Sequence, residues 1–578
     1  MSALFPPAPE LRNFAEVLQW QGVNHPDKTI FRFLTDGETR EESITYSQLD
    51  DRARGIADRL SVHAQKGDRV LLLLTPGIDF IAAFFGCLYA GCVAIPTYPH
   101  LRQKKDSILT RILNVAADAE PKAILSNDVV ERASAVFFAE SEHTRDIPWL
   151  DVSQIPPLSD ADWRGPSSEA DDLAFLQYTS GSTNTPKGVM VSHGNLMHNA
   201  MTITNLFGLN PDDRCVLWLP PYHDMGLIGG ILTPVFAGVE TIHMAPAYFL
   251  QRPIRWLQAV TRFRATVTGA PNFAYDYAVK KVKPEQLAGL DLSTLAVAFS
   301  GAEPINADTL LRFADYFAPT GFQESTFLPC YGLAEGTLMI TSQTRGNGFV
   351  SRRFNKTALE QHRVAPDPEN GRPLVGCGST DDDTVLRITD PHTLLPTPEG
   401  QIGEIWAGGG SIAQGYWNRP EATRETFQAF VADTGEGPFM RTGDLGFVQH
   451  NQLFITGRIK SLIIIDGSNH YPQDIEWTVE HCHPDIQPHG AAAFSVDLDG
   501  AEKLIIVAEL DQRTLRDLTD EQARAIKRAI TGAVANEHAL SVHDIVFTGR
   551  LPKTTSGKIK HHECRAEYLE SLTNPQAP

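Results

Sequence analysis

The chain has 578 residues, a formal net charge of -20 at pH 7, and 42% hydrophobic and 21% charged residues. This composition excludes a disordered or fibrous protein, and because one hydrophobic core rarely serves more than about 300 residues, the length predicts two or more domains. The acidic balance argues against broad nucleic-acid binding, which depends on a basic surface.

The seven cysteines contain no CxxC pair, a pattern typical of unpaired thiols in a reducing cytoplasm. The start, MSALFPPAPELRNF, has neither the basic nor the apolar region of a secretory signal. Pro76, Asp79 and Pro96 interrupt the most apolar stretch, 70–98, which therefore predicts strand, turn, helix and strand and no membrane span. We expect a cytoplasmic protein.

Strand-like apolar runs alternate with helical patterns over most of the chain. The expected strands are 69–74, 123–126, 173–179, 216–219, 266–268 and 295–300. Alternation of this kind predicts βα units and mostly parallel sheets.

The strand at 173–179 leads into an unusual stretch, QYTSGSTNTPKGVMVSHGNL at 177–196. Such clusters of Gly, Ser, Thr and Pro are usually surface loops. Here the loop leaves a strand end, and Ser192 can cap a helix behind it. Glycine-rich backbone, hydroxyl groups and one lysine form the composition of a phosphate-binding loop. It is neither a Walker loop nor a GxGxxG dinucleotide fingerprint.

Shorter pieces follow beyond Gly400, with strands expected at 453–455 and 461–466. A compact second unit is expected from about residue 460. It combines a strand at 462–465, a helix opened by Pro472, a strand at 504–509 and a helix whose apolar residues have helical spacing: Ile526, Ile530, Ala533 and Val534. This unit has about a hundred residues, the size of a domain.

Five motifs occur in order: YTSGSTNTPKG at 178–188, YGLAEGT at 331–337, RTGDLG at 441–446, GRIKSLI at 457–463 and LPKTTSGKIK at 551–560. Together they resemble the adenylate-forming superfamily of acyl- and aminoacyl-activating enzymes. Three stretches are most similar to its fatty acyl-AMP ligase branch: LPPYHDMGLIGG at 219–230, FSGAEP at 299–304 and RIKSLIIIDGSNHYPQDIE at 458–476. A polar segment at 341–380 resembles the insertion of that branch.

The resemblance implies an α/β fold. A large N-terminal adenylation domain, 1–459, would contain αβ-layered, mostly parallel sheets and a small β-barrel-like subdomain, with the insertion at about 341–380. A small mobile α+β domain, 460–578, would follow, with its hinge at Lys460. In this branch the insertion packs on the large domain, restrains the swing of the small one and disfavours coenzyme A as acceptor.

The resemblance also implies the nucleotide site. Thr179, Ser180, Gly181, Ser182 and Thr183 would wrap the β- and γ-phosphates of ATP, with Lys187 close by. The remaining expected contacts to ATP or AMP are Ser300, Gly301, Ala302, Glu303, Tyr331, Gly332, Leu333, Ala334, Asp444, Ile455, Arg458 and Lys558.

In addition to these residues, Glu335, in YGLAEGT, is expected to hold Mg²⁺, which prefers carboxylate, phosphate and water oxygens. Its alternative is a solvated loop glutamate. Tyr331 offers a flat face for adenine opposite the backbone of Gly301 and Ala302; the alternative is a core tyrosine.

Asp444 is expected to accept hydrogen bonds from the ribose hydroxyls, with Arg458 as a second contact. The alternatives are a turn cap for Asp444 and an interdomain salt bridge for Arg458. Lys558 is expected to be the catalytic cation that bridges the carboxylate and the α-phosphate. Its neighbours Lys553 and Lys560 are interpreted as surface charges.

His223 resembles the gate between the ATP site and the acyl tunnel, although a lone histidine beside prolines is often structural. The tunnel is expected along the apolar MGLIGG stretch, whose glycines would leave room for an alkyl chain. The residues assigned to it are Tyr222, His223, Met225, Gly226, Ile228, Gly269, Pro271 and Phe273.

The expected function is activation of a medium- or long-chain fatty acid by ATP and Mg²⁺, followed by acyl transfer to a holo acyl carrier protein acting in trans. A monomer without nucleic-acid partners is expected. The nearest alternative is a fatty acyl-CoA ligase, which differs only in its acceptor. An alternative of another class is a non-catalytic nucleotide-binding scaffold, against which the presence of Lys187, Glu335, Asp444, Arg458 and Lys558 argues.

Overall fold

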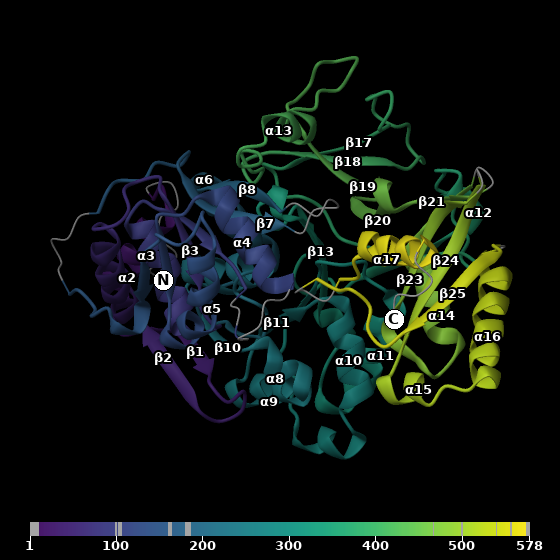
Figure 1. The fold of residues 1–578 in the computed structure, drawn as a ribbon, viewed down its shortest axis with the longest axis horizontal. Helices are drawn as coiled ribbons and strands as arrows, with labels where there is room; N and C mark the ends of the chain where they lie inside the picture. The colour runs from purple at the N-terminus through teal and green to yellow at the C-terminus, as the bar shows by residue number, and fades with distance from the viewer. Residues whose placement is uncertain are drawn as a thin grey trace. The chain divides into compact units, whose positions relative to one another are not determined.

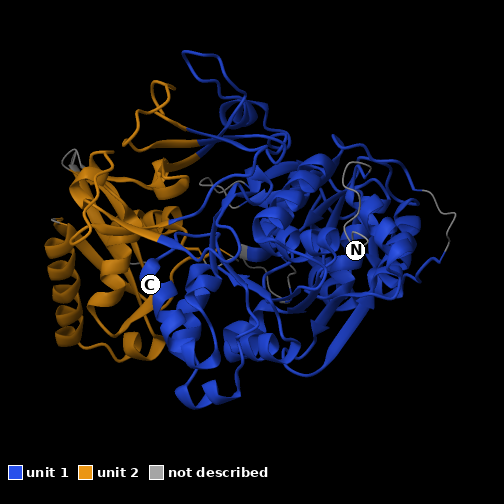
Figure 2. Ribbon diagram, turned by 180° about the vertical axis from the view of Figure 1, so that it is seen from behind, with its two compact units in different colours: residues 1–350, 376–387, 406–442 blue, residues 351–375, 388–405, 443–578 orange. Residues whose placement is uncertain are grey.

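The computed structural model describes residues 11–98, 101, 107–159, 165–179, 186–465, 468–498, 501–538, 540–554 and 558–573. Two compact units are drawn in different colours in Figure 2. Unit 1 comprises residues 1–350, 376–387 and 406–442, and unit 2 comprises residues 351–375, 388–405 and 443–578. Each unit is described by itself.

The first sheet of unit 1 has the order β6-β5-β3-β4-β7-β8. Figure 1 labels β3, β7 and β8 of this sheet. Its strands are β6 Trp149–Asp151, β5 Ala123–Ser126, β3 Arg69–Leu73, β4 Val93–Pro96, β7 Leu173–Thr179 and β8 Lys187–Ser192. All pairs are parallel except β7 with β8. The apolar residues of β3 are fully buried, as expected for a parallel strand covered on both faces. The strands predicted in this part of the chain are confirmed.

The second sheet of unit 1 has the order β14-β13-β12-β11-β9-β10-β1-β2. Its strands are β14 Thr341–Ser342, β13 Phe327–Tyr331, β12 Val297–Ser300, β11 Val267–Ala270, β9 Arg214–Leu217, β10 Glu240–Met244, β1 Thr29–Leu34 and β2 Glu41–Thr45. The strands from β13 to β1 run parallel, and β14 and β2 are antiparallel edges.

The strand β9 begins and ends two residues before its predicted bounds of 216–219. Its polar first residue, Arg214, pairs with Glu240 of β10, and Leu217 pairs with His243. Pairing along the neighbouring backbone, and not the apolar pattern alone, therefore determines where this strand lies.

The described part of unit 1 contains the following helices. They are α1 Phe14–Asn24, α2 Tyr46–Leu60, α3 Ile78–Tyr89, α4 Ser107–Ala119, α5 Asp128–Glu140, α6 His193–Phe207, α7 Thr233–Ala237, α8 Pro246–Gln251, α9 Ile254–Phe263, α10 Asn272–Lys281, α11 Ala307–Phe317 and α13 Pro420–Phe427. Ser192 caps α6, because its side chain accepts from the backbone N–H of Asn195 and Asn195 bonds back in a capping box. The cap predicted from the sequence is confirmed.

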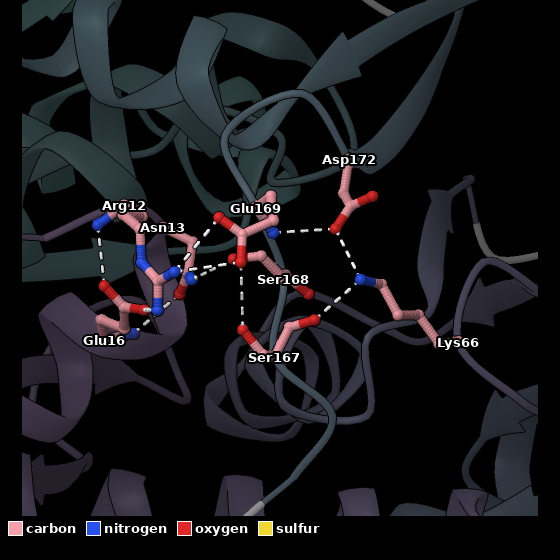
Figure 3. A network of polar contacts seen from close by, with 8 residues as sticks. All are labelled: Arg12, Asn13, Glu16, Lys66, Ser167, Ser168, Glu169 and Asp172. Atoms are coloured by element: carbon pink, nitrogen blue, oxygen red, sulfur yellow. Dashed lines mark hydrogen bonds and ion pairs between the residues drawn. The ribbon is translucent and has the colours of Figure 1, made fainter.

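A polar network holds the chain just before β7 (Figure 3). Asn13 Nδ2 donates to the carbonyl of Ser168 at 2.8 Å, and Lys66 Nζ lies 2.7 Å from Asp172 Oδ2. The hydrogen bond from Lys66 lowers the pKa of the Asp172 carboxyl. Arg12 also pairs with Glu169 at 2.9 Å. Exposed pairs of this kind contribute about 1 kcal/mol or less each, so their joint effect is to fix the entry into β7.

A third sheet has the order β15-β16-β20-β19-β18-β17. Its strands are β15 Val350–Phe354, β16 Arg372–Gly376, β20 Gln452–Arg458, β19 Met440–Gln449, β18 Gly403–Gly408 and β17 Val385–Thr389. The turn between β19 and β20 consists of His450 and Asn451, both with positive φ, as a type I′ hairpin requires. The predicted strand 453–455 lies inside β20.

The C-terminal part of unit 2 contains a three-stranded sheet, β23-β24-β25, and a small hairpin. The strands are β23 Ile486–Leu498, β24 Ala501–Leu510, β25 Val542–Thr548, β21 Ile463–Ile465 and β22 Ser468–His470, and the helices are α14 Pro472–Cys482, α15 Gln512–Arg516, α16 Asp520–His538 and α17 His561–Thr573. The helices predicted from Pro472 and around Ile526 are confirmed. The strand predicted at 461–466 is shorter, because residues 459–461 form a 3-10 turn.

The segment 341–380, expected to be an insertion, contains β14, β15, β16 and the helix α12 Lys356–Glu360. Within unit 2, Lys356 Nζ lies 3.0 Å from Glu537 Oε2, and Arg372 Nη2 lies 2.8 Å from Asp474 Oδ1. Burial raises the pKa of the Asp474 carboxyl to about 6, although the charge of Arg372 opposes this shift. The segment is therefore bound by ion pairs to α14 and α16.

Among the residues that the structure describes, no helix combines the length and apolarity that a membrane crossing requires.

Candidate active site

The expected ligand-binding residues of unit 1 follow parallel strands that lie side by side. The neighbours β13, β12, β11 and β9 run in one direction, so the segments after them begin at the same edge of the sheet. Ligands of open α/β sheets bind at this carboxyl edge. The segments carry Gly332 to Glu335 after β13, Gly301 to Glu303 after β12, Pro271 and Phe273 after β11, and Tyr222 to Ile228 after β9.

The hairpin of β7 and β8 holds the two ends of the predicted phosphate loop together. Thr179, the last residue of β7, pairs with Lys187, the first residue of β8. Ser180, Gly181, Ser182 and Thr183 lie outside the described residues. Lys187 Nζ lies 4.9 Å from the centroid of the Tyr416 ring, a cation–π contact.

Tyr416 contacts both Lys187, through its ring, and the expected magnesium ligand Glu335, through its hydroxyl. The Tyr416 hydroxyl donates to Glu335 Oε1 at 2.8 Å, and the backbone N–H of Ala413 donates to the Glu335 carbonyl at 2.9 Å. Tyr416 is buried. The buried Tyr416 side chain thus holds the Glu335 carboxylate and the Lys187 ammonium close to each other.

Tyr416 was not predicted from the sequence. Its signal is the stretch GYWNRP at 415–420, which runs along β8: Met190 N donates to the Gly415 carbonyl and Trp417 N to the Gly188 carbonyl, both at 2.8 Å. Nothing in the spacing of the chain indicates that this stretch meets Glu335.

The donor set around Glu335 fits a magnesium ion held largely by its nucleotide. Among the described residues no group of three or more His, Cys, Asp or Glu side chains lies close enough to hold a metal on its own. Mg²⁺ in ATP sites keeps several waters and takes one or two protein carboxylates together with phosphate oxygens. A single carboxylate that shares Tyr416 with Lys187, the residue after the predicted phosphate loop, matches that requirement.

The expected adenine pocket has backbone packed unusually close. A Cβ on Gly332 would lie 1.7 Å from the Leu338 carbonyl oxygen, and a Cβ on Gly301 would lie 2.8 Å from Cys330 Sγ. Ala302 has φ of 70°, in the left-handed region. Tyr331 ends β13 and is mostly buried, and the buried Ser300 Oγ has no hydrogen-bond partner among the described residues.

Several of the expected acyl residues lie on a short π-helix, and others lie in the segments beside it. Residues Met225–Leu232 form a π-helix, a form found often at functional sites. His223 Nδ1 lies 2.5 Å from Asp224 Oδ1, which orients the ring. Phe273 N donates to Glu303 Oε1 at 2.6 Å, so one hydrogen bond joins an expected acyl residue to an expected nucleotide residue.

The reason given for Gly226, one of the glycines of MGLIGG, is wrong, and Gly269 of the expected pocket is packed in the same way. A Cβ on Gly226 would lie 2.0 Å from the Pro220 carbonyl oxygen, and a Cβ on Gly269 would lie 2.3 Å from the ring of Phe299. Protein atoms already fill the room beside both residues. These glycines permit close packing and do not leave space for an alkyl chain.

In unit 2, Asp444 and Arg458 face each other across the β19–β20 hairpin. They are register partners, and Arg458 Nε lies 2.5 Å from Asp444 Oδ1. Asp444 is buried, whereas the Arg458 side chain is 61% exposed. Asp444 lies within a strand, so it does not cap a turn. Ile455 is half-buried on β20 and pairs with Gly446.

Lys558 lies on a tight hairpin of unit 2. Thr554 N donates to the Lys558 carbonyl at 2.7 Å, and Lys558 N donates to Thr554 Oγ1 at 3.0 Å. Lys558 is exposed, as is Lys460 in the 3-10 turn after β20. The interpretation of Lys553 and Lys560, the lysines near Lys558, as surface charges is wrong. Lys553 pairs with Glu509 at 2.9 Å and Lys560 with Glu563 at 2.7 Å, and both lysine side chains are about three-quarters buried.

The fold and these residues define the class of protein as an adenylate-forming, AMP-binding enzyme. The family model described as AMP-binding enzyme matches residues 18–417, and a second model, the AMP domain of Disco-interacting protein 2-like proteins, matches residues 460–576. The chain belongs to the AMP-binding enzyme family, and within it to the fatty acyl-AMP ligase branch.

Of three similar proteins, the first and the third support the branch, whereas the second is described as a CoA ligase. The chain is 40% identical to the medium-chain-fatty-acid–[acyl-carrier-protein] ligase JamA of Moorena producens, over 97% of this chain and 96% of that protein. It is 39% identical to FadD21 of Mycobacterium tuberculosis, described as a putative fatty-acid–CoA ligase, over 95% of this chain and 96% of that protein. It is 39% identical, with a TM-score of 0.77, to the fatty acyl-adenylate ligase of Legionella pneumophila in complex with acyl adenylate and pyrophosphate, and covers 98% of each chain.

Proposed function

We propose that this fatty acyl-AMP ligase activates medium- or long-chain fatty acids and delivers them to a holo acyl carrier protein in trans. A carboxylate oxygen attacks the α-phosphorus of ATP, the bond to the bridging oxygen breaks, and pyrophosphate leaves. The phosphopantetheine thiol then attacks the acyl carbon of the mixed anhydride, and AMP leaves while the thiol gives up its proton. The observation that carries the proposal is the Lys187–Tyr416–Glu335 arrangement beside the phosphate loop.

The residues of unit 1 perform the positioning that such a transfer requires. We propose that Thr179, the loop 180–183 and Lys187 hold the β- and γ-phosphates, with Glu335 as the protein ligand of Mg²⁺. The ion, when bound, neutralises phosphate charge. Tyr331 and the close-packed backbone at 301–303 and 332–334 would hold adenine, since tight backbone excludes side chains from a flat ring.

The acyl chain would enter beside the π-helix. Met225, Ile228 and Phe273 supply apolar surface, and the hydrogen bond from Phe273 to Glu303 sets that surface against the nucleotide residues. Tyr222 and Pro271 complete the wall. His223, oriented by Asp224, would stand between the two substrates as a gate.

The proposed roles of unit 2 concern the ribose and the transferred charge. Asp444 would accept hydrogen bonds from the ribose hydroxyls, with Arg458 beside it. Lys558 would neutralise the negative charge that gathers as the fatty-acid carboxylate attacks the α-phosphorus. We place the domain boundary and the hinge at Lys460, which is exposed in a short turn.

Substitution of Lys460 by proline tests the hinge. Proline fixes φ near -65°, so a residue that must change its backbone angles between two half-reactions can no longer serve both. We expect K460P to slow one half-reaction, adenylation or acyl transfer, and to leave the other near the wild-type rate. Wild-type rates in both would place the hinge elsewhere.

The acceptor experiment tests the function as a whole. The protein is incubated with ATP, Mg²⁺ and dodecanoic acid, with no acceptor, with coenzyme A, or with a phosphopantetheinylated carrier protein, and the acyl product is identified by mass. We expect dodecanoyl-AMP to form and persist with coenzyme A, and the acyl group to appear on the carrier.

The second candidate is a fatty acyl-CoA ligase, favoured by the description of the similar FadD21. It shares every step up to the adenylate. Rapid formation of dodecanoyl-CoA would establish this candidate and would contradict a restraining role for segment 341–380. Absence of any acyl-adenylate would favour a non-catalytic scaffold.

A further inference from the structure

The hairpin that carries Lys558 is anchored at its base. The two arms meet at Lys553 and Ile559, and Lys560 N donates to the Pro552 carbonyl at 2.9 Å. On the outgoing arm, Glu509 of β24 accepts from Leu551 N at 3.1 Å and from Lys553 Nζ at 2.9 Å. The outgoing arm is therefore bound to the sheet through one carboxylate.

The return arm has an anchor of a different kind. It runs directly into α17, whose first residue is His561, and His561 Nε2 lies 2.6 Å from Glu476 Oε1. Glu476 projects from α14, and the same oxygen accepts from Ala493 N of β23 at 2.9 Å. One carboxylate oxygen thus joins α14, β23 and the start of α17. His561 is separated from Lys558 by only two residues, Ile559 and Lys560.

Burial lowers the pKa of His561, but the charge and hydrogen bond of Glu476, together with the Ile559 carbonyl, outweigh burial and raise it above the ordinary 6.5. Other charged groups of this region are engaged elsewhere: Glu563 pairs with Lys560 at 2.7 Å and lies 3.9 Å from His562. Among the described residues, other titratable groups of this region are Asp474 on α14, Cys564 and Glu567 on α17, and Glu509 and Lys553 at the hairpin base. The His561 ring is therefore the group that forms an ion pair with the Glu476 carboxylate.

We propose that His561 is a positioning residue for Lys558: its ion pair with Glu476 fixes the return arm of the hairpin and holds the lysine in place for adenylation. The inference rests on the proposed role of Lys558. Since a misplacement of about 1 Å costs up to ~10²-fold in rate, an arm without this anchor slows the first half-reaction without removing any reacting group.

The pair also makes the first half-reaction depend on pH. A histidine whose pKa is raised by folding contributes its full stabilisation below the ordinary value of 6.5 and loses it as the pH rises through the raised value. The anchor is therefore complete at slightly acidic pH and is released on the alkaline side.

Two substitutions of His561 separate positioning from folding. H561Q keeps a hydrogen-bond donor for Glu476 but removes the charge and the titration, whereas H561K keeps a positive charge that does not titrate near neutral pH. H562Q, the same change at the neighbouring residue, is the matched control. Thermal unfolding of each variant shows whether the fold is retained.

Both half-reactions are measured from pH 6 to pH 9: dodecanoyl-AMP formation from ATP and dodecanoic acid, and transfer from supplied dodecanoyl-AMP to a holo carrier protein. We expect H561Q to lower the kcat of adenylation about tenfold at pH 6.5, with KM for ATP and the transfer rate unchanged. Its profile should lack the alkaline fall of the wild type, and H561K should restore adenylation and extend it to higher pH. H562Q should behave as wild type.

Wild-type adenylation and pH profile in H561Q would overturn the inference, as would an equal loss in both half-reactions, which indicates a general structural role. K558A in the same experiment separates this failure from failure of the proposed function. If the wild type forms dodecanoyl-AMP and K558A does not, a normal H561Q refutes the inference alone. If the wild type forms no dodecanoyl-AMP, or K558A forms it normally, the function or the role of Lys558 is wrong and the inference falls with it.

Discussion

Replacement of Lys558 by alanine is expected to reduce the rate of dodecanoyl-AMP formation on the order of 10³-fold. Adenylation brings a carboxylate and a polyphosphate together, so negative charge accumulates where the new bond forms, and a mobile ammonium group offsets it at that point. The exposed position of Lys558 on the return arm of its hairpin suits a group that approaches a ligand. The rate is measured as pyrophosphate release in a single turnover.

The control for this prediction is K527A, which removes a half-exposed lysine from α16 of the same unit. It should adenylate at the wild-type rate. K558A should also transfer the acyl group from supplied dodecanoyl-AMP normally, because no carboxylate attacks phosphorus in that step. Retention of more than a tenth of the wild-type adenylation rate in K558A would mean that another cation neutralises the transition state.

Replacement of Glu335 by glutamine is expected to reduce adenylation on the order of 10²-fold at millimolar Mg²⁺ and to raise the Mg²⁺ concentration needed for half-maximal rate. A metal ion stabilises the transferring charge by several kcal/mol, and an amide is a far weaker ligand for it than a carboxylate. Glutamine still offers an oxygen to the Tyr416 hydroxyl, which donates at 2.8 Å in the native protein, so the local packing should persist.

The matched variant is Y416F, which removes the hydroxyl but leaves the ring beneath Lys187. It frees the Glu335 carboxylate without changing its charge, so we expect a loss of roughly tenfold, the effect of misorienting a metal ligand, and a smaller rise in the Mg²⁺ requirement. Mg²⁺ saturation curves at fixed ATP distinguish the two variants. Identical Mg²⁺ saturation curves for E335Q and the wild type would show that Glu335 is not a ligand of the metal.

Much of the fold follows from local patterns. Apolar runs such as residues 69–74 and 173–179 become strands because they cannot remain in water, and Ser192 caps α6 because its hydroxyl reaches a backbone N–H three residues on. The motifs around Lys187, Glu335 and Lys558 identified the superfamily because each is a short run whose chemistry depends on its neighbours in sequence. These features require no knowledge of distant parts of the chain.

The site's supporting contacts depend on distant parts of the chain. Tyr416 meets Glu335 across 81 residues, and His561 meets Glu476 across 85. Lys553 was interpreted as a surface charge because its partner, Glu509, lies 44 residues away in the chain; the partner of Lys560, Glu563, is only three residues away and was overlooked. The packing beside Gly226 was likewise misjudged, because the Pro220 carbonyl fills that space only after the backbone has folded.

The amino-acid sequence alone therefore determined the α/β class, the family and the residues proposed to bind ATP, since periodicity and short motifs are local properties of the chain. Only the tertiary structure decided which side chains hold those residues in place. Tyr416 between Lys187 and Glu335, and Glu476 beneath the hairpin of Lys558, are positioned by packing of separate elements, and such long-range pairings leave no mark on the spacing of residues along the chain.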